Sequence, residues 1–181
     1  SLYSQSIPEH EVTNYALDNI EEFVDFLSYP NDANNKEDIE KLITWTSNRF
    51  NTLGFKTKRL ETESIPLLLA ELVYKKNYKT ILIYLHLDGQ PVDKTKWHQE
   101  DPYKPVLKKT NIDGKYIIVD WKNLNNKSLE EIDNENLRIF ARSSSDAKGP
   151  VMMLINALEI MSLNNLKSKF NIKLIMDFEE E

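Results

Sequence analysis

The stretch KTILIYLHLDGQPVD, residues 79–93, joins a buried strand to a pair of chemically active side chains. Apolar residues fill positions 81–85, and a glycine and a proline soon end the run. An uninterrupted apolar run is typical of a strand covered on both faces, so we expect a central strand here. His86 and Asp88 follow at its end, and because they are two residues apart, both point to the same face.

The composition restricts the class of protein. The chain has 181 residues, of which 40% are hydrophobic and 29% charged, enough for one domain with a substantial core. A net charge of -6 argues against nucleic acid or an anionic membrane as the main partner. The absence of cysteine excludes disulfides and thiolate metal sites. No apolar run is long enough for a membrane span. No leader begins at Ser1, so we expect a mature or trimmed chain, which fits a cytoplasmic or an exported protein alike.

The pattern of apolar residues predicts an alternation of helices and strands. Helical spacing predicts helices at 10–29, 39–53 and 149–163, with Gly54 as a left-handed cap of the second and residues 31–35 as a loop. Alternating or apolar runs predict strands at residues 55–62, 66–74, 80–87, 115–121, 137–142 and 169–178. Residues 123–136 read as a polar excursion. We therefore expect an α/β fold, a three-layer α/β/α sandwich around a largely parallel or mixed central sheet.

Chemically active side chains follow three of these strands. His86 and Asp88 end the first, Asp146 comes shortly after the second, and Glu179, Glu180 and Glu181 follow the third. In open α/β sheets the carboxyl ends of strands converge on a crevice where ligands bind. A histidine with several carboxylates suits zinc or a similar divalent ion.

Each group also has an ordinary explanation when taken alone. A His-x-Asp pair is commonly a hydrogen-bonded surface pair, and Asp146 fits a turn acid near a helix start. A run of glutamates is usually a solvated cluster, but here it follows an apolar strand, where like charges repel unless a cation or proton compensates them. Asp88 can accept the second ring N–H of His86 and fix its tautomer. Together the three groups favour a metal site, whereas His10 and His98 read as surface residues.

Four segments resemble the M20 family of zinc metallopeptidases, and within it the dipeptidase or carnosinase-like branch. HLDGQPVD is similar to that branch's His-x-Asp-x-Gln-Pro segment. Trp97 followed by DPYKPVL resembles its Trp…(Asp/Glu)-Pro-Phe segment, and ARSSSDAKGPVMMLINALE resembles its Gly-Arg-Gly-x-x-Asp-x-Lys-Gly-Pro segment and the following helix. DFEEE stands where the family has Glu-Gly-x-Glu-Glu. The four matches come in the family's order and cover residues 81–181.

The resemblance implies a role for each matched residue. His86 would bind one metal ion and Asp88 would orient it, while Asp146 would bridge two metal ions. Glu180 would be the general acid and base, and Glu181 a ligand of the second ion. The implied cofactor is a pair of zinc ions, with manganese or cobalt as alternatives. A register one residue earlier would make Glu179 and Glu180 the functional pair, but we prefer the later one.

The sequence departs from the family pattern beside two of these ligands. Ala141 and Ser143 replace the two glycines that flank Arg142, which puts the geometry of that turn in question. Arg142 and Lys148 have an equally good structural explanation, in which they hold the carboxylate of Asp146 and cap its turn. Asp177 keeps the acidic position that precedes the glutamates in the preferred register.

The resemblance implies a parent enzyme that hydrolyses a peptide bond in dipeptides or short peptides at a di-zinc site. Residues 1–181 would be the N-terminal part of its catalytic domain. Further ligands and a lid or dimerisation domain would lie downstream, consistent with a homodimeric parent, and residues 1–181 alone would be inactive. An N-acyl-amino-acid amidohydrolase of the aminoacylase or desuccinylase type is an alternative, and so is a non-catalytic binding fragment.

Overall fold

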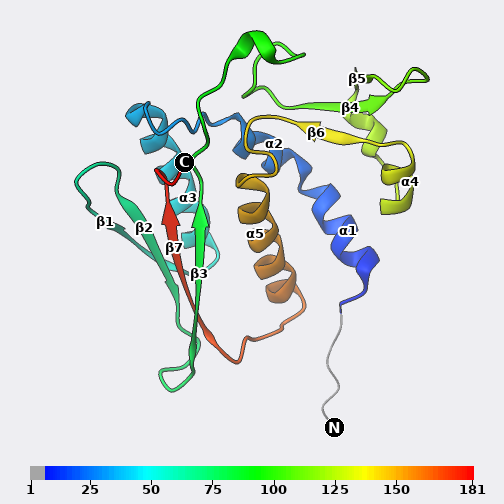
Figure 1. Ribbon diagram of the computed structural model, residues 1–181. Coiled ribbons are helices and arrows are strands. Elements are labelled where there is room, and N and C mark those ends of the chain that lie inside the picture. The colour runs from blue at the N-terminus through cyan, green and yellow to red at the C-terminus, as the bar shows by residue number, and fades with distance from the viewer. Residues whose placement is uncertain (1–6) are drawn as a thin grey trace.

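The computed structural model describes residues 7–181, which form two separate sheets and five α-helices (Figure 1). The helices are α1 (Glu9–Asp18), α2 (Ile20–Ser28), α3 (Lys36–Thr52), α4 (Leu129–Asn134) and α5 (Lys148–Leu163), with short 3-10 turns η1 (Lys94–Lys96) and η2 (Trp121–Leu124). The strands are β1 (Lys56–Leu60), β2 (Leu67–Leu72), β3 (Thr80–His86), β4 (Val106–Thr110), β5 (Tyr116–Val119), β6 (Arg138–Phe140) and β7 (Asn171–Asp177). Within residues 7–181, none of the helices combines the length and apolarity that crossing a bilayer requires.

The main sheet is mixed and places two of the expected strand ends side by side. Its order is β1-β2-β7-β3, with β1 and β7 antiparallel to β2, and β3 parallel to β7. The register pairs His86 with Asp177, so β3 and β7 end side by side at the same end of the sheet. The prediction of an α/β fold with a mixed sheet is confirmed.

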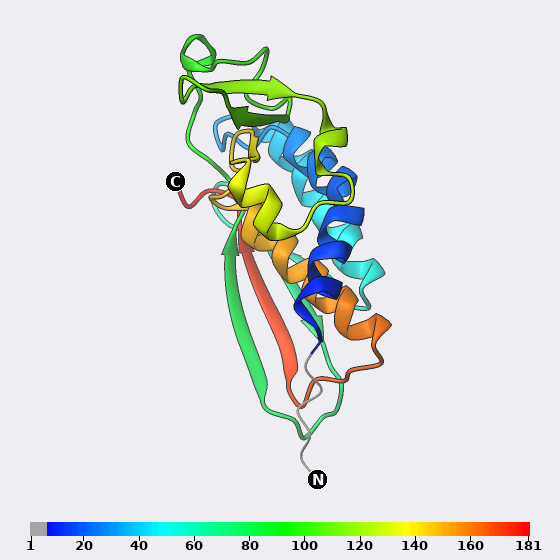
Figure 2. The same cartoon turned by 90° about the vertical axis from the view of Figure 1, so that its right-hand side faces the viewer.

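Helices α1, α2, α3 and α5 lie on one side of the main sheet, as Figure 2 shows from the edge. The core between the two layers is apolar and includes Phe26, Ile39, Leu42, Phe50, Leu68, Leu87, Val151, Ile155, Leu174, Met176 and Phe178. The three-layer arrangement that the sequence predicted would need helices on the other face as well. Among residues 7–181 that face has no helical layer.

The prediction that β3 is a central strand is wrong for the described residues. β3 pairs only with β7 and forms an edge of the sheet, and Leu82 on it is 60% exposed. The apolar run indicates that the strand has apolar side chains to bury on both of its faces. It does not say which segment covers that surface, and here α5 packs on one face only.

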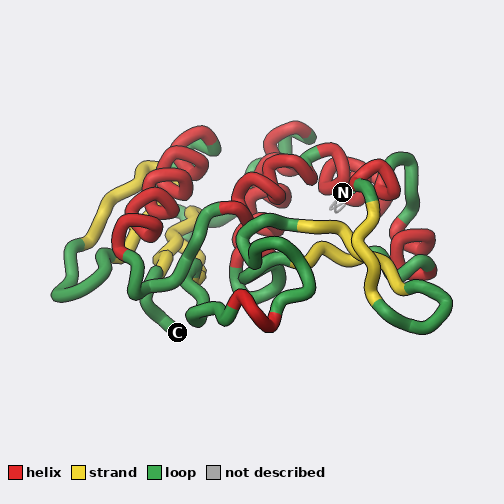
Figure 3. The backbone as a smooth tube through the Cα atoms, turned by 90° about the horizontal axis from the view of Figure 1, so that it is seen from above, coloured by secondary structure: helices red, strands yellow, loops and turns green. Residues whose placement is uncertain are grey.

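The second sheet lies beside the main sheet rather than continuing it (Figure 3). Its order is β5-β4-β6, entirely antiparallel, and Leu107, Leu124 and Leu137 form its small core. The sequence analysis missed β4, for which it predicted no strand, and α4, which lies in the segment that read as a polar excursion. The start of α4 does carry a sequence signal, since Ser128 and Glu131 form a reciprocal capping box.

The three predicted helical segments are helical in the structure, but the first of them is divided in two. The expected first helix is interrupted at Asn19, which separates α1 from α2. Gly54 adopts a positive φ of 87° after α3, as the sequence predicted. Arg49 of α3 bonds to Glu22 of α2 and Glu159 of α5, so one partly buried guanidinium ties three helices together.

Candidate metal centre

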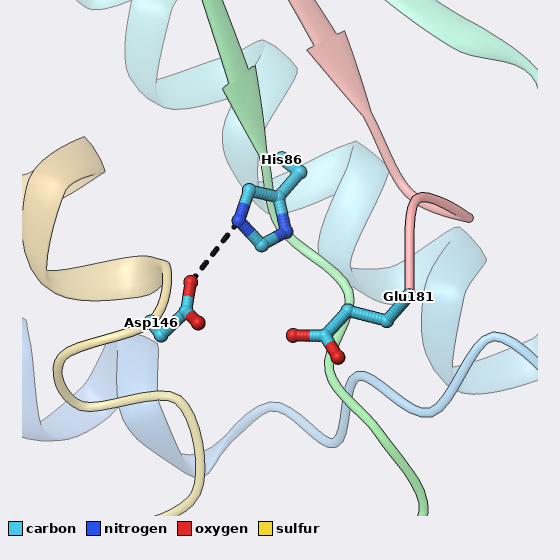
Figure 4. Close-up of side chains that lie close together, drawn as sticks. All are labelled: His86, Asp146 and Glu181. Carbon is cyan, nitrogen blue, oxygen red and sulfur yellow. Dashed lines mark ion pairs between the residues drawn. The ribbon is translucent and has the colours of Figure 1, made fainter.

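Three segments that are far apart in the sequence meet at the carboxyl ends of β3 and β7 (Figure 4). His86 ends β3, Asp146 lies in the loop before α5, and Glu181 follows β7. Each offers one possible ligand atom, and these three atoms lie within 4.8 Å of one another. The side chain of His86 is largely covered, whereas Asp146 and Glu181 are exposed. The three side chains therefore lie together as the sequence predicted, but only two of them follow strands of the main sheet, because β6, the strand before Asp146, belongs to the second sheet.

The two ring nitrogens of His86 face different carboxylates. Nε2 lies 3.1 Å from Oδ1 of Asp146. Nδ1 lies 3.6 Å from Oδ1 of Asp88 and 3.7 Å from Oε2 of Glu180, and it is buried without a hydrogen-bond partner. One side of the ring therefore opens to the exposed carboxylate, and the other is turned to the strand end and the tail after β7.

Asp88 connects the ends of β3 and β7. Its side chain is fully buried, and its Oδ2 accepts the backbone N–H of Glu181 at 2.9 Å. Its other oxygen, Oδ1, is buried without a hydrogen-bond partner and is the atom nearest to His86. A buried carboxylate is costly unless it is compensated, so this free oxygen needs a donor such as the ring N–H of the histidine.

The three glutamates after β7 have different surroundings. The carboxylate of Glu179 accepts hydrogen bonds from Oγ of Ser64 at 2.6 Å and from the backbone N–H of Ile65 at 3.3 Å, both in the turn between β1 and β2. Glu180 instead lies beside His86, and Glu181 belongs to the three-residue cluster. The first glutamate is thus held by the β1–β2 turn, and the other two are available to the centre.

Asp177 shapes the turn that leads into these glutamates. Its Oδ1 accepts the backbone N–H of Glu179 at 3.1 Å, and its Oδ2 accepts the hydroxyl of Tyr84 at 3.1 Å. Partial desolvation of the hydroxyl and this hydrogen bond raise the pKa of Tyr84 to about 12, because both disfavour the phenolate. Tyr84 therefore stays protonated and remains a donor to Asp177.

The loop that carries Asp146 is anchored at both ends. The backbone N–H of Arg142 bonds to the carbonyl of Pro102, and that of Lys148 bonds to the carbonyl of Ser143. Ser143 itself has a φ of 60°, the left-handed conformation that the family's glycine would adopt more easily. The sequence had placed this turn in question, and the serine accommodates it.

Lys148 is completely buried at the start of α5. Its ammonium donates to the backbone carbonyls of Phe26 and Tyr29, and it lies over the ring of Phe26. Burial lowers the pKa of Lys148 to about 7. Lys148 therefore has a structural role, but it holds the end of α2 and not the carboxylate of Asp146 that the sequence analysis had considered.

The donor set fits a divalent cation. One imidazole nitrogen and several carboxylate oxygens suit zinc, and manganese or cobalt to a lesser degree. Four carboxylates surround a single imidazole, those of Asp88, Asp146, Glu180 and Glu181. A cation beside the ring would relieve their mutual repulsion, and a proton at Nδ1 would give the two unpartnered buried atoms of His86 and Asp88 a hydrogen bond. His10 and His98 are exposed and lie outside this cluster.

One buried residue that is bonded to the segments carrying the centre was missed by the sequence analysis. Asn31, in the segment that read as a plain loop after α2, is fully buried and bonds to both Leu87 and Ser143. Its sequence surroundings contain three other asparagine or aspartate residues typical of a turn, so no local signal separates it from them.

The chain is similar to dipeptidases of known function. No family model matches it. Over 116 residues, 64% of this chain, it is 31% identical to the Beta-Ala-His dipeptidase of Mus musculus and 32% identical to that of Homo sapiens. The matched stretch is 18% of the length of each of these relatives, so the chain corresponds to a small part of them.

Solved structures of related peptidases share the fold. Human carnosine dipeptidase 1 matches 94% of this chain and 34% of its own with a TM-score of 0.66 at 21% identity. A di-peptidase from Saccharomyces cerevisiae has the same coverage, with a TM-score of 0.70 at 16% identity. An M20 family metallo-carboxypeptidase from Sulfolobus solfataricus matches 90% of this chain and 31% of its own, with a TM-score of 0.64 at 24% identity. These relatives and neighbours are hydrolases of peptides, as the resemblance of the four segments implied.

Proposed function

We propose that this chain, a relative of the Beta-Ala-His dipeptidases with an M20 metallopeptidase fold, is the N-terminal part of a catalytic domain that hydrolyses dipeptides or short peptides at a two-zinc site. The observation that carries the proposal is the convergence of His86, Asp146 and Glu181 from three separate segments. Because the matched stretch is 18% of the relatives' length, the proposal concerns the whole protein of which these residues are part.

Three side chains of this chain would hold the two ions. His86 would bind one ion through Nε2, the nitrogen that faces the open side of the centre. Asp146 is exposed and its carboxylate offers two oxygens, which suits a carboxylate shared between two ions, and Glu181 would bind the second. When bound, the ions would polarise the scissile carbonyl and make the attacking water more acidic. Manganese or cobalt would serve the same ligands.

Asp88 and Glu180 would act on protons rather than on the ions. Asp88 would accept the Nδ1–H of His86, once the present 3.6 Å separation closes, and so keep Nε2 free as a ligand. Glu180 is half-exposed beside the same ring, so that water can reach its carboxylate. It would take the proton of the attacking water and deliver it to the leaving amine.

The surroundings of Glu179 support this register over the earlier one. Its carboxylate already accepts hydrogen bonds from Ser64 and Ile65. The earlier register would need that carboxylate as the proton carrier, and the turn between β1 and β2 would have to release it. Glu180 and Glu181 need no such change.

The experiment compares three glutamine variants in the full-length protein. Glu180→Gln keeps the shape but cannot carry a proton, so we expect bound metal to persist while kcat falls by on the order of 10²–10⁴. Glu181→Gln removes an anionic ligand, so metal content and activity should fall together. Glu179→Gln is the matched control and should keep both metal and most of the activity.

Metal stoichiometry by elemental analysis, beside kcat on a dipeptide and on an N-acyl amino acid, distinguishes the outcomes. Loss of metal in Glu180→Gln with loss of turnover alone in Glu179→Gln would favour the earlier register. A full-length protein that cleaves only the N-acyl amino acid would be an amidohydrolase, and one that cleaves neither would overturn the proposal.

A further inference from the structure

We infer that Asn31 is a positioning residue that sets the separation between His86 and Asp146. The inference rests on the proposed function, because it takes these two residues as metal ligands. We call residues 86–89 the His86 arm and residues 142–148 the Asp146 arm. Asn31 belongs to neither arm and lies in the loop after α2, yet it is hydrogen-bonded to both.

A single amide nitrogen joins the two arms. Nδ2 of Asn31 donates to the carbonyl of Leu87 at 2.7 Å and to Oγ of Ser143 at 2.9 Å. The first acceptor lies directly after His86, and the second lies three residues before Asp146. The backbone carbonyl of Asn31 also accepts the N–H of Gly89 at 2.9 Å. Three hydrogen bonds from one residue therefore fix the His86 arm at two points and the Asp146 arm at one.

The same loop also holds the Asp146 arm from its other side. The ammonium of Lys148 donates to the carbonyl of Tyr29, two residues before Asn31. Asp146 thus lies between two anchors, Ser143 and Lys148, that both attach to the end of α2 and the loop behind it. A shift of this loop would move Asp146 relative to β3, and with it the two ligand atoms that lie 3.1 Å apart.

The donor character of the amide is what the site uses. Both N–H groups of Asn31 have acceptors, whereas its Oδ1 is buried without a hydrogen-bond partner. An aspartate would place an oxygen against the carbonyl of Leu87, and a leucine would leave that carbonyl and the serine hydroxyl unpaired. Only a side chain with two N–H donors on one atom satisfies both arms from this position.

A second buried asparagine provides a matched control at the opposite end of the sheet. Asn171, the first residue of β7, donates to the carbonyls of Lys75 and Tyr78 and accepts the N–H groups of Tyr74 and Lys75. It is a buried asparagine that ties a loop to the sheet, as Asn31 does, but it lies away from the centre. Asn171→Leu therefore removes four side-chain hydrogen bonds, against two for Asn31→Leu, with no contact to either arm.

The test compares Asn31→Leu, Ser143→Ala and Asn171→Leu in the full-length protein, with Zn²⁺ alone as the probe in competition with a chelating dye. Partners that orient metal ligands typically contribute 10–100-fold in metal affinity, so we expect a loss of that size for Asn31→Leu and a smaller loss for Ser143→Ala. Asn171→Leu should lower the melting temperature and leave the zinc affinity within about twofold of wild type. Zinc affinity is the measurement that a purely structural role would not change.

Amide hydrogen exchange provides a second measurement that needs no metal. Exchange should become faster in both arms of Asn31→Leu, at residues 86–89 and 142–148, and in Asn171→Leu only around residues 74–78. The inference is overturned if Asn31→Leu and Ser143→Ala both bind zinc as tightly as the wild type does. It is also overturned if hydrogen exchange in Asn31→Leu is unchanged in both arms. If Asn31→Leu does not fold, Ser143→Ala decides it. Wild-type protein that binds no zinc counts against the proposed function, and the exchange result still decides the role of Asn31.

Discussion

Gly89→Ala is the sharpest steric test of the contact between the two arms. A Cβ at this position would lie 2.5 Å from Oγ of Ser143, 3.1 Å from Nε of Arg142 and 3.2 Å from Nδ2 of Asn31. The φ of Gly89 is outside the left-handed region, so the backbone conformation itself admits alanine. The substitution therefore destabilises the fold by displacing these three side chains, which lie where the His86 arm meets Asn31 and the Asp146 arm.

The size of the effect follows from two opposing terms. Overpacking a tight site by one carbon destabilises the fold by about 1–3 kcal/mol. Alanine also lowers the conformational entropy of the unfolded chain relative to glycine, which offsets about 0.4–1 kcal/mol of this loss. A net loss of about 1–2 kcal/mol corresponds to a fall in Tm of roughly 2–8 °C for a chain of this size. Because the contact at 2.5 Å falls on the hydroxyl that bonds to Asn31, zinc affinity should fall too, by about tenfold or more.

A rescue and a control separate this mechanism from general destabilisation. Ser143→Gly removes the clashing oxygen and relaxes the positive φ of that residue, so it should restore part of the stability lost in Gly89→Ala, with a coupling of about 1 kcal/mol. Gly114→Ala is the control, since its Cβ would meet nothing within 4 Å and its cost comes only from a φ of 74°. It should lower Tm without a change in zinc affinity and without rescue by Ser143→Gly.

Urea denaturation and zinc competition on the two single variants, the double variant and the control complete the assay. Strict additivity of Gly89→Ala and Ser143→Gly would refute the reasoning, because the two side chains would then not meet. Wild-type zinc affinity in Gly89→Ala would equally refute it, since the steric shift would not reach the ligands.

Two further predictions concern the buried lysine and the isolated chain. Because burial lowers the pKa of Lys148 from 10.5 to about 7, the unfolded chain binds more protons between these values, so stability should rise by about 2 kcal/mol from pH 7 to pH 9. Urea denaturation should show a smaller rise of stability with pH in Lys148→Met than in the wild type. An equal rise in both proteins would contradict the prediction. Residues 1–181 alone should show little or no dipeptide hydrolysis, since three ligands cannot complete two four-coordinate zinc shells. Chelator-sensitive turnover by the purified chain would show that expectation to be wrong.

The part of the centre that sequence analysis could predict is the part whose chemistry is local. Imidazole and carboxylate are the ligands that zinc takes, and strand ends are where an α/β sheet presents them. His86 and Asp146, 60 residues apart, could therefore be predicted to lie together, and their atoms lie 3.1 Å apart, although the strand before Asp146 belongs to the second sheet. The helical and strand periods likewise predicted α3, α5 and β7, because each buries one continuous apolar face.

The parts that were missed depend on partners that lie elsewhere in the chain. The apolar run of β3 predicted a central strand, but which neighbour covers a strand is decided by topology. β4 was missed because one of its two buried residues is Lys108, whose ammonium lies over the ring of Phe140 and bonds to the carbonyl of His98. A lysine that buries its stem and bonds to a carbonyl cannot be distinguished by sequence from an exposed one.

The run of three glutamates shows why a residue's role needs more than its type. The carboxylates of Glu179, Glu180 and Glu181 are chemically the same, and the sequence left two registers open. What separates them is Ser64, a residue 115 positions away, whose hydroxyl bonds to the first glutamate and not to the other two. Asn31 acts on the other side of the centre through the same kind of contact. The chemistry of a metal ion determines which types of side chain can bind it. Which of several identical side chains is available to bind depends on the distant loops that contact them.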